Sequence, residues 1–133
     1  CTGKRAVVIG RSPVVGRPAA MLLLERNATV TVCHTRTRAL SDVTREADII
    51  VSAAGAAGCL TAAHVRPGQT IIDVSANWDA AKNTIVGDAD FDAAASIVDA
   101  ITPVPGGVGA VTSAVLMRHV VQAAERTLEG GNL

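Results

Sequence analysis

The segment AVVIGRSPVVGRP, residues 6–18, joins a β-branched apolar run to a turn that carries two glycines. Gly10 allows a sharp turn after a strand, and Gly16 allows the following helix to approach a strand or ligand closely. Free N–H groups and the helix dipole favour a phosphate at such a turn. Ser12 replaces the second glycine of the dinucleotide pattern G-x-G-x-x-G and adds a hydroxyl group. The segment predicts a phosphate-binding turn, although an ordinary strand-to-helix connection fits the pattern equally well.

A basic cluster follows the second apolar run. Proteins that bind NAD often carry Asp or Glu here, about 20 residues after the glycine turn, to bind the ribose hydroxyls. This chain has CHTRTR, residues 33–38, and its next carboxylate is Asp42. The residues suited to a 2′-phosphate are His34, Thr35, Arg36 and Arg38, with Arg11 from the first turn. We expect NADP as the cofactor and NAD as the alternative, while solvated surface arginines are the simplest competing interpretation.

A third unusual segment is TPVPGGVGAVT, residues 102–112. Two prolines stiffen it, and three glycines permit backbone geometry that other residues resist. Such a loop can lie flat against a planar ring and present N–H groups to it. The competing interpretation is a rigid connector into the last helix.

Side chains for proton transfer are sparse. His34, His64 and His119 have no obvious nucleophile or carboxylate partner. Asp73 and Asp88 end extended segments and could act as acids, although capping a loop is the simpler role. We therefore expect a cofactor site with no catalytic residue and no metal ligand in this chain.

The elements that would position these segments alternate along the chain. Four runs are apolar almost throughout, as in parallel strands covered on both faces: residues 5–10, 28–34, 47–55 and 69–75. Amphipathic stretches predict helices over residues 16–27 and 37–47, a helical turn within 61–68 and a short extended segment within 83–91. The alternation predicts an α/β fold in one domain, residues 1–133: a Rossmann-type, doubly wound, mostly parallel sheet with helices on both faces.

The longest predicted helix covers residues 111–131. Thr112 or Ser113 is suited to cap its N-terminus, and Gly130–Gly131 is suited to end it. One stripe of the helix consists of Val115, Leu116, His119, Val120 and Ala123.

Composition disfavours several classes of protein. Twelve basic and twelve acidic residues, with one Trp, one Phe and no Tyr, argue against a nucleic-acid partner. No apolar run is long enough to span a bilayer, and no signal-like leader opens the chain, so we expect no membrane partner. Cys1, Cys33 and Cys59 form no C-x-x-C pair and indicate reduced thiols in a cytoplasmic protein.

Six segments, in their order and spacing, resemble the NAD(P)-binding domain of bifunctional methylenetetrahydrofolate dehydrogenase/methenyltetrahydrofolate cyclohydrolase. They are GKRAVVIGRSPVVGRP, TVTVCHTRT, ADIIVSAAG, IIDVSAN, IVGDADF and ITPVPGGVGAVTSA. The resemblance covers residues 3–127 and implies a Rossmann-type domain that holds NADP, or NAD in some members. It implies cofactor contacts at Gly10, Arg11, Ser12, Gly16, His34, Thr35, Arg36, Ala54, Gly55, Ala76, Asn77, Gly107 and Thr112. Pro105 and Gly106 fall in the loop that lies beside nicotinamide and folate, on the substrate side.

The same resemblance implies the reactions of the complete enzyme. Such enzymes oxidise 5,10-methylenetetrahydrofolate to 5,10-methenyltetrahydrofolate and hydrolyse that product to 10-formyltetrahydrofolate. The family's catalytic lysine and tyrosine belong to a separate N-terminal domain, through which the tetrahydrofolate derivative would bind. Because this chain starts at Cys1, we expect a domain trimmed from a longer protein, inactive alone. Relatives commonly pair through this domain, so we also expect a homodimer.

Four residues depart from the family pattern. Ser75 replaces a glycine and Ala76 a larger apolar residue, while Ala110 and Val111 replace a proline and a methionine. A proline common after Gly55 is also missing. These departures keep two alternatives open: a non-catalytic or repurposed nucleotide-binding module that senses NADP or binds a protein, and a relative that reduces another cyclic imine.

Overall fold

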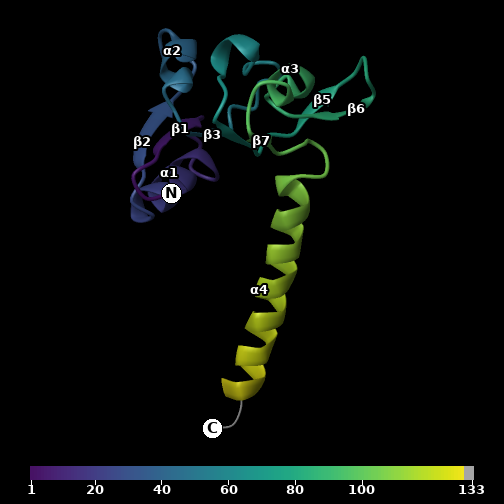
Figure 1. Ribbon diagram of the computed structural model, residues 1–133. Coiled ribbons are helices and arrows are strands. Elements are labelled where there is room, and N and C mark those ends of the chain that lie inside the picture. The colour runs from purple at the N-terminus through teal and green to yellow at the C-terminus, as the bar shows by residue number, and fades with distance from the viewer. Residues whose placement is uncertain (131–133) are drawn as a thin grey trace.

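Five parallel strands form the central sheet of the computed structural model, which describes residues 1–130 (Figure 1). They are β1 (Arg5–Ile9), β2 (Thr29–Cys33), β3 (Ile49–Ser52), β4 (Thr70–Asp73) and β7 (Ala100–Ile101). Their order in the sheet is β2-β1-β3-β4-β7, and every neighbouring pair is parallel. The chain therefore builds outward from β1 first to one side and then to the other, which is the doubly wound arrangement.

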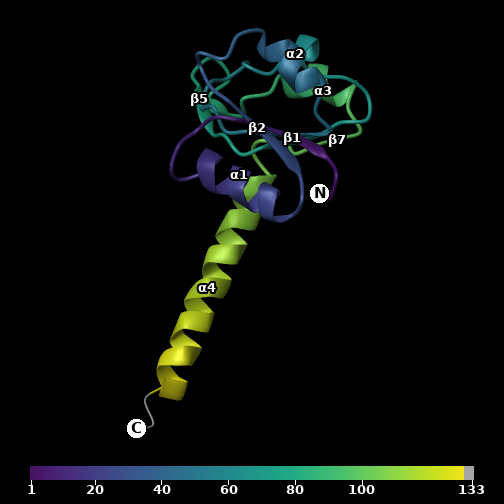
Figure 2. The ribbon, with the colours of Figure 1, turned by 90° about the vertical axis from the view of Figure 1, so that its left-hand side faces the viewer.

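Helices cover both faces of this sheet. The helices are α1 (Gly16–Glu25), α2 (Leu40–Arg45), the short 3₁₀ turn η1 (Ala62–His64), α3 (Phe91–Ala95) and α4 (Val108–Gly130). Figure 2 shows α2 and α3 above the sheet and α1 below it. The predicted Rossmann-type α/β class, with helices on both faces, is confirmed.

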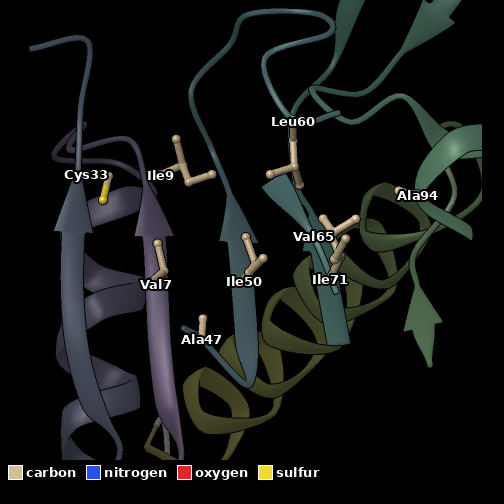
Figure 3. Packing of buried hydrophobic residues seen from close by; sticks show 9 residues of the cluster. All are labelled: Val7, Ile9, Cys33, Ala47, Ile50, Leu60, Val65, Ile71 and Ala94. Atoms are coloured by element: carbon tan, nitrogen blue, oxygen red, sulfur yellow. The ribbon is translucent and has the colours of Figure 1, made fainter. Parts of the chain in front are cut away.

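The apolar character of the strands follows from this double cover. On the face of α2 and α3, Val7, Ile9 and Ile50 belong to one buried cluster (Figure 3). On the face of α1, Val8 and Val51 belong to a second cluster. Consecutive residues of β1 are thus buried on opposite faces, which is why the run is not alternately polar.

Two short elements lie beyond the sequence predictions. The expected extended segment within 83–91 contains β6 (Thr84–Val86), which pairs antiparallel with β5 (Asn77–Asp79) in a separate hairpin. β5, with three residues, and β7, with two, are too short to give a period-two signal.

The last helix differs from its prediction in both its start and its surroundings. It begins at Val108, so Thr112 and Ser113 lie inside the helix rather than at its cap. Their hydroxyls donate to the carbonyl oxygens of Val108 (2.9 Å) and Gly109 (3.1 Å), four residues earlier, which is the usual bond for such residues within a helix. Gly130 is its last residue, and Gly131 lies outside the described residues.

Helix α4 extends away from the sheet instead of packing on it (Figures 1 and 2). Leu116 and Val120, in the predicted apolar stripe, are 61% and 56% exposed. Within residues 1–130, no helix is long and apolar enough to cross a membrane.

Candidate functional site

The carboxyl ends of β1 and β3 mark the position where the strand order reverses. In doubly wound sheets, ligands bind in the crevice outside the strand ends at this switch point. The predicted phosphate turn follows β1, the basic cluster follows β2, and the loop of Ala54 and Gly55 follows β3. The topology thus brings three predicted cofactor segments to one edge of the sheet.

Two glycines let three backbone segments meet at the phosphate turn. Gly10 has a φ of +117°, and a Cβ atom there would overlap the carbonyl oxygen of Ala53. A Cβ atom at Gly16 would overlap the carbonyl oxygen of Gly10. The Gly10 N–H donates to Cys33 O (2.8 Å), and the Ala53 N–H donates to Ile9 O (2.7 Å). The predicted sharp turn and close approach are both present.

Ser12 helps to build the turn. Its Oγ accepts the N–H groups of Val15 (3.1 Å) and Gly16 (3.4 Å), and its carbonyl accepts the N–H of Arg17 (3.0 Å). These bonds satisfy N–H groups at the start of α1 that have no partner within the helix. The hydroxyl predicted for the ligand therefore has its acceptor side engaged in the turn and retains its hydrogen for donation.

The basic loop after β2 is held by its own polar groups. The His34 N–H donates to Thr37 Oγ1 (2.9 Å), and the Arg36 N–H donates to His34 Nδ1 (3.1 Å). Thr35, Arg36 and Arg11 are exposed. Among residues 1–130, the salt bridges involve Arg5 and Arg66, so neither Arg11 nor Arg36 is engaged by a carboxylate. Both guanidinium groups stay available for an anion at the ends of neighbouring strands.

Asp88 joins the loops that follow β3 and β4. Its carboxylate is completely buried. Its Oδ2 accepts from Ser75 Oγ (2.7 Å), Ala54 N (2.8 Å), Ser52 Oγ (3.0 Å) and Gly55 N (3.3 Å). Its Oδ1 accepts from Ala56 N (2.8 Å) and Asn77 Nδ2 (3.1 Å). The simpler role expected for Asp88, capping a loop, is confirmed, but one carboxylate ties together two loops that both bear predicted cofactor residues.

The environment of Asp88 favours its ionised form. Burial alone would raise the pKa of this carboxyl, but the hydrogen bonds from Ser75, Asn77 and the backbone of Ala54 and Ala56 outweigh it and lower the pKa. The nearby Asp73 differs, because burial raises its pKa more than the N–H groups of Ala89 and Ser75 lower it. The Asp73 carboxylate also caps loops. Its Oδ2 accepts from Ala89 N (2.8 Å), and its Oδ1 accepts from Ser75 N (3.1 Å).

The lowered pKa of Asp88 predicts a pH-dependent contribution to stability. A carboxyl with a lowered folded-state pKa stabilises the fold fully above its ordinary pKa of about 3.8, and this contribution is lost as the pH falls through the folded value. The difference in the free energy of unfolding between the wild type and Asp88→Asn, measured in urea, should therefore be largest near neutral pH and narrow in acid. Asp73 is present in both proteins, but the Asp88 charge helps to raise its pKa, so its contribution cancels only in part. A gap that stays constant into strong acid would contradict the ionised state of Asp88.

A cavity of about 250 Å³ brings together Ala76 with the predicted loop residues 105–107, but it is lined by neither Asn77 nor Thr112. Its lining includes Ser75, Ala76, Pro105, Gly106, Gly107 and Ala110. Thr112 lies one turn into α4 with its hydroxyl bonded to Val108, so the structure does not place it with the others. A larger cavity, about 520 Å³, contains none of the predicted cofactor residues and is lined by four aspartates, which suit a phosphate poorly. Within the described chain, no cluster of His, Cys, Asp or Glu has the arrangement of a metal site.

Comparison with known proteins agrees with this geometry. The family model for the NAD(P)-binding domain of tetrahydrofolate dehydrogenase/cyclohydrolase matches residues 1–128. The bifunctional protein FolD of Carboxydothermus hydrogenoformans is 59% identical over 124 residues, which make up 92% of this chain and 43% of that protein.

Solved structures extend the likeness to three dimensions. The bifunctional FolD enzyme of Campylobacter jejuni superposes with a TM-score of 0.90 at 45% identity, over 95% of this chain and 44% of that one. The Trypanosoma brucei enzyme, solved with NADP cofactor and inhibitor, has a TM-score of 0.87 at 39% identity, over 96% and 45%. This chain spans less than half the length of these relatives. It belongs to the tetrahydrofolate dehydrogenase/cyclohydrolase family and is the NAD(P)-binding domain of that family.

Proposed function

We propose that residues 1–133 form the NADP-binding domain of a bifunctional folate enzyme. The complete enzyme oxidises 5,10-methylenetetrahydrofolate to 5,10-methenyltetrahydrofolate and hydrolyses that product to 10-formyltetrahydrofolate. The observation that carries the choice of NADP is the pair Arg11 and Arg36, both exposed and without a carboxylate partner in the described chain, at the ends of β1 and β2. Arg suits a phosphate because its planar guanidinium can donate two parallel hydrogen bonds.

The remaining predicted residues extend the proposed site along the strand ends. The turn from Gly10 to Gly16 would hold the diphosphate, and His34 and Thr35 would border the 2′-phosphate. Ala54, Gly55, Ala76 and Asn77 would lie under the middle of the cofactor. The cavity beside Pro105, Gly106 and Gly107 would receive nicotinamide, and NADP supplies the acceptor for the substrate's hydride.

Titration of the full-length protein with NADP and NAD tests the cofactor. We expect NADP to bind at least about tenfold more tightly, since one charge-assisted hydrogen bond to the 2′-phosphate is worth about 1.5–3 kcal/mol. Isothermal titration calorimetry at fixed ionic strength measures both affinities. Equal affinities would refute the choice of NADP.

The rest of the protein is proposed to bind the folate substrate and to supply the catalytic groups. The relatives are more than twice the length of the matched region, and α4 leaves apolar side chains exposed, including Met117 and Val121, which could pack against the rest of the protein. We propose a cytoplasmic homodimer, for which the exposed cross-strand pair Trp78 and Ile85 offers one apolar surface.

This division of labour predicts an inactive isolated chain. Purified residues 1–133 should not turn over 5,10-methylenetetrahydrofolate with NADP, while the full-length protein should form NADPH, measured by absorbance. Turnover by the isolated chain would contradict the proposal. NADPH formation by neither protein, despite tight NADP binding, would instead favour the repurposed nucleotide-binding module.

A further inference from the structure

We propose that Asp88 is a positioning residue that fixes the loops expected under the middle of the cofactor and beside its nicotinamide. This inference rests on the proposed function. Asp88 lies just after β6, yet its carboxylate reaches the loops after β3 and β4, which precede it by 32 to 36 and by 11 to 13 residues. Ala54 and Gly55 in one loop and Asn77 in the other are predicted to face the cofactor. One buried group thus sets the relative position of both loops.

The loop after β3 is organised as an anion-binding nest that the protein fills itself. The successive N–H groups of Ala54, Gly55 and Ala56 all converge on the Asp88 carboxylate. Such a run of backbone donors ordinarily binds phosphate. Because Asp88 already satisfies these donors, the diphosphate is directed to the turn at Gly10, and this loop is left to contact the uncharged part of the cofactor.

Hydrogen bonds to Asp88 fix both the position of the segment after β4 and the orientation of the Asn77 side-chain amide. The Ser75 hydroxyl donates to Oδ2 (2.7 Å), and the Asn77 amide donates to Oδ1 (3.1 Å). An ionised carboxylate can only accept, so the NH₂ end of Asn77 must face it. The side-chain oxygen of Asn77, Oδ1, is thereby directed away from Asp88 as a hydrogen-bond acceptor of fixed orientation.

An asparagine at position 88 would break this arrangement with little change in volume. With its oxygen in the place of Oδ2, its NH₂ group would confront the N–H of Ala56 and the NH₂ of Asn77, where donor meets donor. In the reversed orientation it would confront the N–H groups of Ala54 and Gly55. In the first orientation the N–H of Ala56 loses its acceptor and the Asn77 amide must turn over, and in the second the N–H groups of Ala54 and Gly55 lose theirs, whereas the serine hydroxyls can rotate.

The test compares two ligands on the full-length protein. NADP reports on the whole site, whereas 2′,5′-ADP carries only the adenosine half, whose phosphates are assigned to Arg11, Arg36 and the Gly10 turn. Asp88→Asn should weaken NADP binding by about tenfold, the loss expected when about a tenth of the variant molecules keep both loops in the binding position. It should leave 2′,5′-ADP binding unchanged and raise the KM for NADP. Asp92→Asn, which removes an exposed carboxylate from α3, is the matched control and should change neither affinity.

A merely structural role predicts a different pattern. If Asp88→Asn weakens both ligands equally, or neither, the positioning role is overturned. Should that variant not fold, Asn77→Ala decides, since removing the oriented amide should weaken NADP binding and spare 2′,5′-ADP. Failure of the wild type to prefer NADP over NAD would instead refute the cofactor proposal, and that result is separate from the behaviour of the variants.

Discussion

Replacing Gly10 with alanine is expected to lower the free energy of unfolding by about 3 kcal/mol or more and to abolish NADP binding. Two costs add at this position. A φ of +117° is unfavourable for alanine, and its Cβ atom would overlap the carbonyl oxygen of Ala53. Relief requires β1 and the loop after β3 to separate, which breaks the bond from Ala53 N–H to Ile9 O. Urea denaturation and calorimetry with NADP measure the two effects.

Gly55→Ala is the matched control for this prediction. Gly55 also has a positive φ, +66°, but no atom lies within 4 Å of the position where its Cβ would stand. Gly55→Ala should therefore lower the free energy of unfolding only by the conformational penalty, about 1–2 kcal/mol. An equal loss in the free energy of unfolding for Gly10→Ala and Gly55→Ala would show that the overlap with Ala53 does not affect stability.

Replacing both Arg11 and Arg36 with alanine should reduce NADP affinity about 100-fold while NAD affinity stays unchanged. Each arginine is expected to donate charge-assisted hydrogen bonds to the 2′-phosphate, which NAD lacks. Both side chains are exposed, so the free energy of unfolding should not change. Calorimetric titration with both cofactors measures the change in preference.

Arg26→Ala provides the control for charge alone. Arg26 is exposed at the C-terminal end of α1, away from the turn where that helix begins. It should leave the preference for NADP intact. Parallel losses of NADP and NAD in the double variant would mean that the arginines support the fold of the site and do not read the 2′-phosphate.

The parts of the fold that could be predicted are those with a strong local signal. β1 and β4 are short, β-branched and buried on both faces, so composition and length identify them. Gly10 and Gly16 predict the turn, because a sharp turn and a close backbone approach are local requirements that glycine meets. In the hairpin, β6 lies within the extended segment predicted for residues 83–91, whereas β5 has three residues and no such signal.

The role of Asp88 could not be predicted in full, because its partners are set by the fold. Its donors lie up to 36 residues away, and no spacing along the chain connects them. The departure at Ser75 is explained by the same contact. A glycine there would have no hydroxyl to donate to Asp88, so this replacement adds a bond to the loop. Nothing in the structure explains the replacements at Ala110 and Val111.

The sheet contributes little to the stability of helix α4, because the helix extends away from it. Its side chains from Leu116 to Leu128 are exposed, whereas most of the stability of helices in proteins comes from packing of an apolar face. A surface that covered these apolar side chains would therefore stabilise the helix further, and that gain would be measured as part of the free energy of association.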